Sequence, residues 1–334
     1  MLLAVDIGGT KTNMAVFTDA GSLKKPLHLK TFASRAYKSF EAVLDDYRNA
    51  IPDEIDRAVI CIAAPIATGK IKLTNLPWEI DPAGMQKQYR MDEISLLNDI
   101  EALCYALPLL SPEEVHTLNR GNADIKGNIA VLAPGTGLGE AFLARIAEKY
   151  YPVASEGGHA EFAPTNRFEI RLLEYLLSRF EHVSFERVCS GMGIQNIYAF
   201  LKDSGLEEPK QLTERLDEND DPTRVIIESA LKAEFTCEIC TRALDTFISI
   251  LGSEAGNLAL KVKATGGLYL GGGIPPAILT RLQKGDFVKA FKAKGRMSYL
   301  MENIPIRVVL SSVANLFGAA NYGYNYTKEP LMVF

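Results

Sequence analysis

A chain of 334 residues is too long for one ordinary hydrophobic core, so two domains are expected. Its composition, 47% hydrophobic and 23% charged, is that of an ordinary globular protein, and a net charge of −5 without a long basic block argues against a nucleic-acid partner. The apolar start, Met1 to Val5, reaches Asp6 at once, which is too short for a secretory signal or a membrane span. Five cysteines in this length do not form a disulfide framework, so we expect a cytoplasmic protein with reduced thiols.

Strands and helices alternate in the first third of the chain, which is typical of an α/β domain. The patterns predict, in chain order, strands Leu2–Val5 and Asn13–Phe17 around a glycine turn, helix Ser39–Asn49, strands Arg57–Ala63 and Glu93–Leu97, and helix Ile100–Leu107 ended by Pro108.

The order strand, glycine turn, strand recurs near residues 128–144, which suggests two related halves. The elements expected in the rest of the chain are strands Asn128–Ala133, Glu140–Ala144, Gly266–Leu270 and Ile304–Leu310, helical segments Ile170–Arg179 and Pro222–Leu251, and a last helix beginning at Leu316–Asn321. The acidic stretch Gly205–Arg224 is expected to be a surface excursion, and the tail Lys328–Phe334 to be mobile.

The first glycine turn follows a strand and opens a hairpin, which excludes a Rossmann turn, and the sequence has no Walker A motif. In a functional interpretation, Gly8 and Gly9 approach a nucleotide phosphate, while the Thr10 hydroxyl and Lys11 touch it. Asp6 would then hold Mg²⁺ through water, because Mg²⁺ gives up its hydration shell reluctantly. The alternative is a structural β-turn with an Asx bond.

Two further glycine clusters follow apolar strands. Gly135, Gly137 and Gly139, with Thr136 in the same loop, would weaken a strand unless something approaches the backbone, so a second phosphate loop is favoured over a bulged hairpin. Gly271 and Gly272 would suit an adenine or ribose lying on the backbone, although a plain strand-to-helix turn explains them nearly as well.

Asn98 and Asp99 lie where a strand meets a helix. Asp99 could be the general base that accepts the proton of a sugar hydroxyl, with its pKa kept low by the helix N-terminus. The alternative is that Asp99 only caps the helix.

Glu156 and His159 stand three residues apart, separated by two glycines, and could grip sugar hydroxyls from one tight loop. A di-iron site is not expected, because such sites carry the pair on a helix and the two glycines would break one. A simple hydrogen-bonded pair remains the alternative. Cys237 and Cys240 lack the further ligands of a zinc site and are interpreted as neighbours on one helix face.

In order and spacing these motifs resemble those of the bacterial glucokinase family, the non-zinc branch of the sugar kinases. The resemblance also includes the segments Leu73–Trp78, Leu97–Ala102, Gly157–Pro164, Glu186–Gly191 and Gly256–Leu260. It implies an α/β, two-domain actin-like ATPase (ribonuclease H-like) fold with the active site in the interdomain cleft. Residues 1–110 and 307–334 would form the small domain, and residues 111–306 a large α/β domain with added helices.

The resemblance further implies ATP-dependent phosphorylation of D-glucose at O6, with Mg²⁺ and without zinc, by a homodimer. Asp99 corresponds to the catalytic base, and Asn98, Glu156, His159 and Glu186 to residues that bind glucose hydroxyls, while Asn75 would line the sugar site. The acidic excursion and the extended tail depart from the family pattern.

Three functions are left open by the residues themselves: a glucose kinase, a kinase for fructose, mannose or an amino sugar, and a sugar-sensing protein without catalysis. A DNA-binding sensor would carry a helix-turn-helix before the first strand, and Asp6 comes too early for one. Glycine loops do not distinguish ATP from ADP or polyphosphate as the phosphoryl donor.

Overall fold

The computed structural model describes residues 1–64, 66, 69–73, 75–232 and 237–327, which divide into two compact units. Unit 1 contains Met1–Pro112 and the chain from Ser311 onward, and unit 2 contains Glu113–Leu310. The expectation for the tail Lys328–Phe334 lies outside the described residues, as does Thr74 in the segment Leu73–Trp78.

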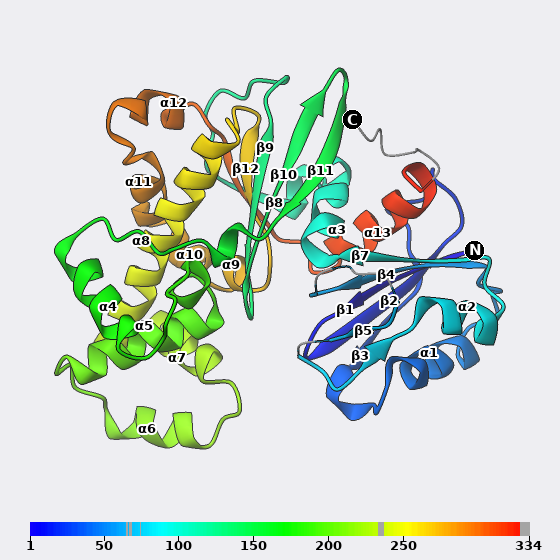
Figure 1. Ribbon diagram of the computed structural model, residues 1–334, viewed down its shortest axis with the longest axis horizontal. Helices are drawn as coiled ribbons and strands as arrows, with labels where there is room; N and C mark the ends of the chain where they lie inside the picture. Colours follow the sequence, from blue (N-terminus) through cyan, green and yellow to red (C-terminus); the bar gives the residue numbers. More distant parts are fainter. Residues whose placement is uncertain (65, 67–68, 74, 233–236, 328–334) are drawn as a thin grey trace. The chain divides into compact units, whose positions relative to one another are not determined.

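Unit 1 is built on a five-stranded sheet in the order β3-β2-β1-β4-β7 (Figure 1). Its strands are β1 (Leu2–Ile7), β2 (Lys11–Phe17), β3 (Leu27–Ala33), β4 (Arg57–Ile62) and β7 (Glu93–Asn98). The first three are antiparallel neighbours, and β4 and β7 continue the sheet in parallel from β1. A separate two-stranded ribbon pairs β5 (Ile71–Lys72) with β6 (Glu79–Ile80).

Helices cover both faces of this sheet because β1 is apolar on both sides. Leu3 and Val5 pack with α1 (Phe40–Asn49) and α2 (Pro82–Tyr89), while Leu2 and Ala4 pack with α3 (Asp99–Ala106) and α13 (Ala314–Asn325). Successive side chains of a strand point to opposite faces, so a single apolar run supplies both cores. The helix expected over Ser39–Asn49 begins at Phe40, and Ser39 is its N-cap, with the Ser39 hydroxyl accepting from the Ala42 N–H.

Unit 2 repeats the same arrangement with one added strand. Its sheet has the order β11-β10-β9-β12-β13-β8. The strands are β8 (Val115–Asn119), β9 (Ile129–Pro134), β10 (Leu138–Ile146), β11 (Lys149–Ser155), β12 (Gly267–Leu270) and β13 (Ile306–Val309). As in unit 1, three antiparallel strands are followed by two parallel ones. The expectation of two related halves is therefore confirmed at the level of strand order and direction.

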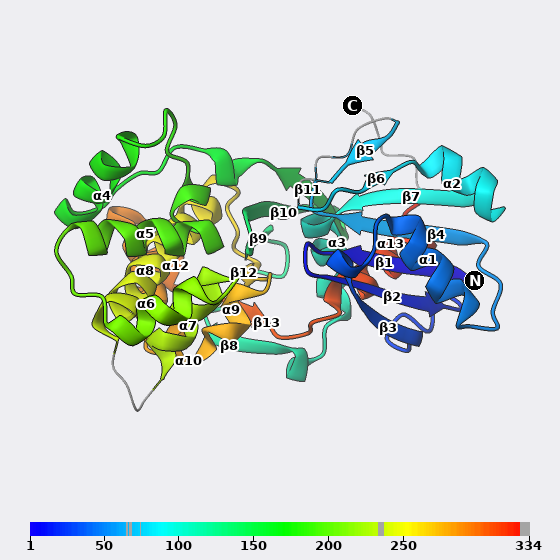
Figure 2. The ribbon, with the colours of Figure 1, turned by 90° about the horizontal axis from the view of Figure 1, so that it is seen from below.

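The helices of unit 2 gather around α8 (Glu238–Lys261), whose core-facing residues are almost completely buried. Figure 2 shows α5 (Gly191–Asp203) and α7 (Pro222–Leu231) beside α8, with which both are in contact. The remaining helices are α4 (Arg167–Leu177), α6 (Lys210–Asp217), α9 (Ile274–Ala277), α10 (Leu279–Leu282), α11 (Asp286–Lys292) and α12 (Ser298–Glu302).

Two expectations need correction. Residues 307–310, expected in the small domain, belong to unit 2 because β13 pairs with β12 and β8. The helical pattern expected over Pro222–Leu251 is not one helix, since α7 ends at Leu231 and α8 begins at Glu238. The acidic stretch 205–224 lies largely exposed at the surface, as expected, and contains a short helix, α6, in which Leu212 is buried.

Candidate active site

The first glycine turn joins β1 to β2 in unit 1 and is closed by hydrogen bonds of its own backbone. The Gly8 N–H donates to the Lys11 carbonyl (2.9 Å). The hydroxyl of Ser34, the residue that follows β3, donates to the Gly8 carbonyl (2.8 Å). A Cβ on Gly9 would lie 3.1 Å from the Cβ of Asn75. The turn expected to bind phosphate thus lies against a residue expected to line the sugar site.

Asp6 lies at the edge of this turn and is partly buried. Its Oδ1 accepts a hydrogen bond from the Asn315 amide (3.2 Å), which comes from α13. Burial raises the pKa of the Asp6 carboxyl, and the hydrogen bonds from Asn315 and Asn13 only partly offset that rise.

Asn98, and not Asp99, caps helix α3. The Asn98 Oδ1 accepts from the Ile100 N–H (3.0 Å), and the Glu101 carboxylate accepts from the Asn98 N–H (3.4 Å), which makes a capping box. The Asn98 amide also donates to the Ala64 carbonyl (3.2 Å). The alternative interpretation of Asp99 as a cap is therefore wrong, and Asp99 is the first residue of the helix.

The expected low pKa of Asp99 is also wrong. Burial, with a contribution from the Asp6 carboxylate, raises the pKa of Asp99 to about 6, although its own N–H and that of Ile100 lower it. The helix N-terminus is outweighed because desolvation and a second carboxylate both disfavour the charged form. An acid with this pKa is ionised at neutral pH and is a stronger proton acceptor than an ordinary aspartate.

The second glycine loop, between β9 and β10, is held in place by hydrogen bonds to residues of the segment 186–191. The Gly191 N–H donates to the Gly135 carbonyl (2.8 Å), and the Leu138 N–H donates to Oε2 of Glu186 (3.0 Å). Exposed Thr136 lies in this loop, whereas Gly139 is already part of β10. The structure brings together a predicted phosphate loop and a predicted sugar ligand.

The third glycine cluster meets the end of the same strand, β9. The Gly271 N–H donates to the Leu132 carbonyl (2.9 Å), and Gly272 has a φ of +78°, with the Pro134 carbonyl 2.6 Å from the position of a Cβ. The positive φ in the turn before α9 therefore requires a glycine at position 272. Gly272 also lies close to the second glycine loop, since Pro134 immediately precedes that loop.

Glu156 immediately precedes a single 3-10 turn, Gly157–His159, and His159 is the last residue of that turn. Their side chains are exposed, with 3.9 Å between His159 Nε2 and Glu156 Oε2. A side chain on Gly157 would overlap the Glu140 carboxylate, and one on Gly158 would overlap the Leu138 carbonyl, so the glycines let the turn lie directly on β10. The expectation that they break any helix holds for an α-helix but not for this 3-10 turn.

Sequence reasoning missed a buried carboxylate beneath this turn. Glu140 is 2% exposed, and its Oε1 has no hydrogen-bond partner among the described residues; the same is true of Oε1 of Glu254. Burial and the nearby Glu254 carboxylate raise the pKa of Glu140 to about 8. The available signal was an acidic residue at an inward position of an otherwise apolar strand.

Cys237 and Cys240 are buried free thiols at the start of α8, where Cys237 is the N-cap and not a residue within the helix as expected. In the described parts of the chain, no group of three or more His, Cys, Asp or Glu side chains could hold a metal ion. The described helices include none that is long and apolar enough to cross a membrane.

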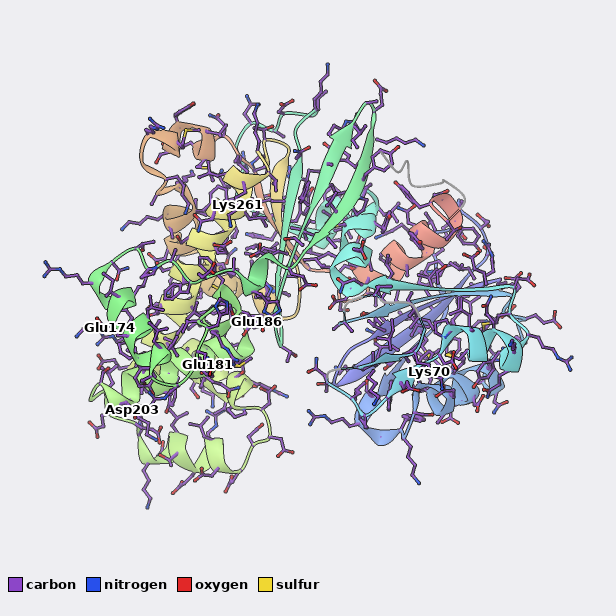
Figure 3. All side chains as sticks on the ribbon, viewed as in Figure 1. Lys70, Glu174, Glu181, Glu186, Asp203 and Lys261 are labelled. Atoms are coloured by element: carbon purple, nitrogen blue, oxygen red, sulfur yellow. The ribbon has the colours of Figure 1, made fainter. Side chains whose placement is uncertain are left out.

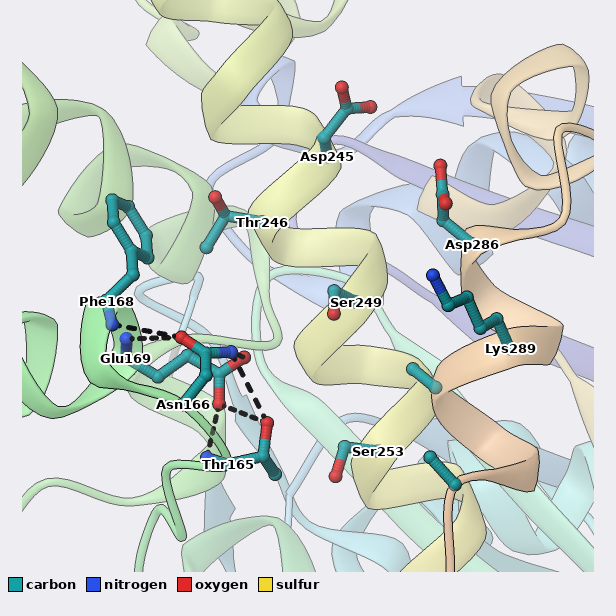
Figure 4. Close-up of a pocket in the computed structure, with 12 residues that line it drawn as sticks. Thr165, Asn166, Phe168, Glu169, Asp245, Thr246, Ser249, Ser253, Asp286 and Lys289 are labelled. Atoms are coloured by element: carbon teal, nitrogen blue, oxygen red, sulfur yellow. Dashed lines mark hydrogen bonds between the residues drawn. The ribbon is translucent and has the colours of Figure 1, made fainter.

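A polar cavity of about 550 Å³ lies apart from all predicted site residues (Figure 4). It is bordered by the start of α4, the middle of α8 and α11. Two of the acidic residues in its lining have partners within the protein: Glu169 accepts hydrogen bonds from Thr165 and Asn166, and Asp245 forms an ion pair with Arg281. We assign no function to this cavity.

The comparisons with known proteins agree with one another. The glucokinase family model matches residues 3–326. The chain is 36% identical to a glucokinase of Trichormus variabilis, covering 96% of this chain and 98% of that protein, and 36% identical to one of Synechocystis, covering 95% and 96%.

Solved structures extend the comparison to the fold. The crystal structure of a glucokinase from an Antarctic psychrotroph has a TM-score of 0.78 at 32% identity, over 96% of this chain and 97% of that one. Two further structures share the fold. One is a Balamuthia mandrillaris glucokinase in complex with glucose, with a TM-score of 0.80 at 21% identity over 96% of this chain and 92% of that one. The other is a ROK family glucokinase from Streptomyces griseus in complex with glucose and AMPPNP, with a TM-score of 0.65 at 17% identity over 96% of this chain and 98% of that one. The expected α/β sugar-kinase fold is confirmed.

Proposed function

The chain belongs to the glucokinase family, and on that premise we propose that it transfers a phosphoryl group from ATP to O6 of D-glucose, with Asp99 as the general base. The observation that supports this role most directly is the state of Asp99. Its neighbour Asn98 is the N-cap of the helix, and Asp99 accepts from the same Ile100 N–H (2.9 Å) that Asn98 already binds. The pKa of Asp99, about 6, suits proton transfer at neutral pH.

In the proposed reaction, the Asp99 carboxylate takes the proton of the O6 hydroxyl as O6 bonds to the terminal phosphorus of ATP. The bond from that phosphorus to the bridging oxygen of ADP breaks, so the products are glucose 6-phosphate and ADP. Because the transition state is loose, the protein's main tasks are to position the hydroxyl and to stabilise the charge on the phosphoryl oxygens.

Both units supply residues for this proposal. The turn Gly8–Lys11 of unit 1 and the loop Gly135–Gly139 of unit 2 would bind phosphates through the backbone, and Gly271 and Gly272 would face the adenine or ribose. The proposed glucose ligands are Asn75 and Asn98 in unit 1, and Glu156, His159 and Glu186 in unit 2.

Asp6 is the residue that would hold Mg²⁺, through water. The Asp6 carboxylate is partly buried and acts electrostatically on the Asp99 carboxylate. A divalent cation would offset the negative charge of these two groups, so the carboxylate oxygens present here fit Mg²⁺. Mg²⁺ is commonly bound by one or two carboxylates together with substrate phosphates. Bound there, it would supply charge neutralisation at the phosphates. Family membership also supports a cytoplasmic homodimer, which light scattering on the purified protein would test.

The direct test is product identification. Purified protein with Mg²⁺, ATP and D-glucose should form a product that glucose 6-phosphate dehydrogenase oxidises. A phosphorylated sugar that this dehydrogenase does not accept would contradict O6 as the acceptor. Glucose binding without any product would favour a sugar-sensing protein.

A further inference from the structure

The Glu186 carboxylate is held by the loop that we assign to ATP phosphates. Glu186 lies on the 3-10 turn Phe185–Arg187, between α4 and α5, and is labelled in Figure 3. Its Oε2 accepts the Leu138 N–H (3.0 Å), whereas its Oε1 has no hydrogen bond to any described residue. One oxygen of the carboxylate is thus fixed to the loop, and the other is available to a ligand.

Gly137 makes room for this contact. A Cβ at Gly137 would lie 2.5 Å from Oε2 of Glu186 and 3.4 Å from its carboxyl carbon. Gly137 is not in the left-handed region, so backbone conformation does not require a glycine there. Gly135, two residues earlier in the same loop, also lacks a positive φ, and its Cβ would have no neighbour within 4 Å. An added Cβ would therefore meet the Glu186 carboxylate at Gly137 and no neighbour within 4 Å at Gly135.

The segment that carries Glu186 is itself tied to the loop. The Ser190 hydroxyl donates to the Glu186 carbonyl (2.7 Å) and accepts from the Gly193 N–H (3.1 Å) as the N-cap of α5. The Gly191 N–H donates to the Gly135 carbonyl (2.8 Å). Hydrogen bonds connect the loop and the segment at both ends, so a collision at Gly137 would be relieved by the Glu186 side chain, whose carboxylate would turn away from the Leu138 N–H.

We propose that Gly137 is a positioning residue of the sugar site: its missing side chain lets the phosphate loop hold Glu186 in the orientation that binds glucose. The proposal rests on the proposed function, in which Glu186 is a glucose ligand. Gly137 would thus contribute to the affinity for glucose, although the position of Gly137 in a glycine loop suggests a role in phosphate binding alone.

The test compares Gly137→Ala with Gly135→Ala, by calorimetric titration of glucose without nucleotide and by the KM for ATP. Gly137→Ala should raise the glucose Kd about tenfold or more, since a hydrogen bond to a charged group is displaced. Gly135→Ala should leave the glucose Kd near the wild-type value, whatever happens to the KM for ATP. An unchanged glucose Kd in Gly137→Ala would overturn the inference, whereas a wild-type protein that binds no glucose would overturn the proposed function.

If Gly137→Ala folds poorly, the Tm of thermal unfolding provides a second test of the contact with Glu186. Gly137→Ala should lower Tm in the wild-type background but not in the Glu186→Ala background, where the colliding carboxylate is gone. An equal loss of Tm, or of folding, in both backgrounds would show that the methyl group meets something other than Glu186, and would contradict the inference.

Discussion

At the scale of single residues, Asp99 has the largest expected effect. Asp99→Asn keeps the size of the side chain but removes the proton acceptor, so kcat should fall by about 10²–10⁴-fold. The glucose Kd should shift by less than about tenfold, ~1.4 kcal/mol, because the other proposed ligands remain. Steady-state kinetics and titration calorimetry would measure the two quantities. Near-normal kcat would remove Asp99 from the mechanism.

Glu101→Gln is the matched control for Asp99→Asn. It removes a carboxylate from the same first turn of α3, and its amide can still accept from the Asn98 N–H. We expect its kcat to stay near the wild-type value. A loss equal to that of Asp99→Asn would mean that negative charge at this helix end, and not a base at Asp99, is what matters.

Asp99→Asn should also retain or gain stability at neutral pH. The pKa of Asp99 is about 6 in the folded protein, against an ordinary value of 3.8, so the folded state binds more protons than the unfolded chain in that range. Stability from this group therefore falls as pH rises from about 4 to about 6 and stays low above. Asparagine has no charge to bury, so Tm at pH 7.5 should be no lower than wild type. A clear drop would indicate a structural role for the charge.

Glu140 should make stability depend on pH in a higher range. The pKa of Glu140 is about 8 in the folded protein, against an ordinary value of 4.5, with Glu254 and Lys261 as the charged neighbours that act on it. Stability should fall as pH rises through about 5 to 8, and Glu140→Gln should remove on the order of 2–4 kcal/mol of that dependence. Denaturant unfolding at several pH values would measure it. Parallel curves for wild type and variant would show that Glu140 does not titrate there.

At the scale of elements, the close crossing of α3 and α13 offers a sharp comparison. A Cβ on Gly318 would overlap the Ala102 carbonyl, a backbone atom, whereas one on Gly323 would meet the flexible end of Leu2. Alanine improves helix propensity by about 1 kcal/mol at both sites. We nevertheless expect Gly318→Ala to lower the free energy of unfolding by about 1–3 kcal/mol and Gly323→Ala to cost less. Equal effects would contradict the backbone contact.

Elements with a strong burial pattern were predictable from the sequence, and elements that bury few residues were not. β1 and β4 are continuous apolar runs, and Ser39 marks the start of α1. Edge strands β3 and β11 bury no residue completely, so they show no apolar alternation. Helix α6 was missed because only one of its residues, Leu212, is buried.

The site was predictable as a set of residue types, but not as an arrangement. Asparagine and aspartate cap helices about equally well, so the sequence could not choose between Asn98 and Asp99. The raised pKa of Asp99 depends on burial and on Asp6, which is far away in the sequence. The contact between Gly137 and Glu186 likewise joins positions that only the fold brings together.

At the scale of the whole molecule, the two units have the same strand order, and the proposed ligands are divided between them. Glucose should therefore protect amides in both units from hydrogen exchange: around Asn98 in unit 1, and around Gly157–His159 and Glu186 in unit 2. Local opening is suppressed where a ligand binds the native state only. Protection confined to one unit would contradict the division of sugar ligands.

We expect this chain to be a glucose kinase that uses ATP. The decisive experiment compares kcat/KM for D-glucose, D-mannose, D-fructose and glucosamine with ATP, ADP or polyphosphate as donor. Sites built to hydrogen-bond particular hydroxyls reject sugars that leave those groups unpaired. We predict the highest kcat/KM for D-glucose with ATP. An equal or higher value for another sugar or another donor, or no turnover at all, would contradict the account.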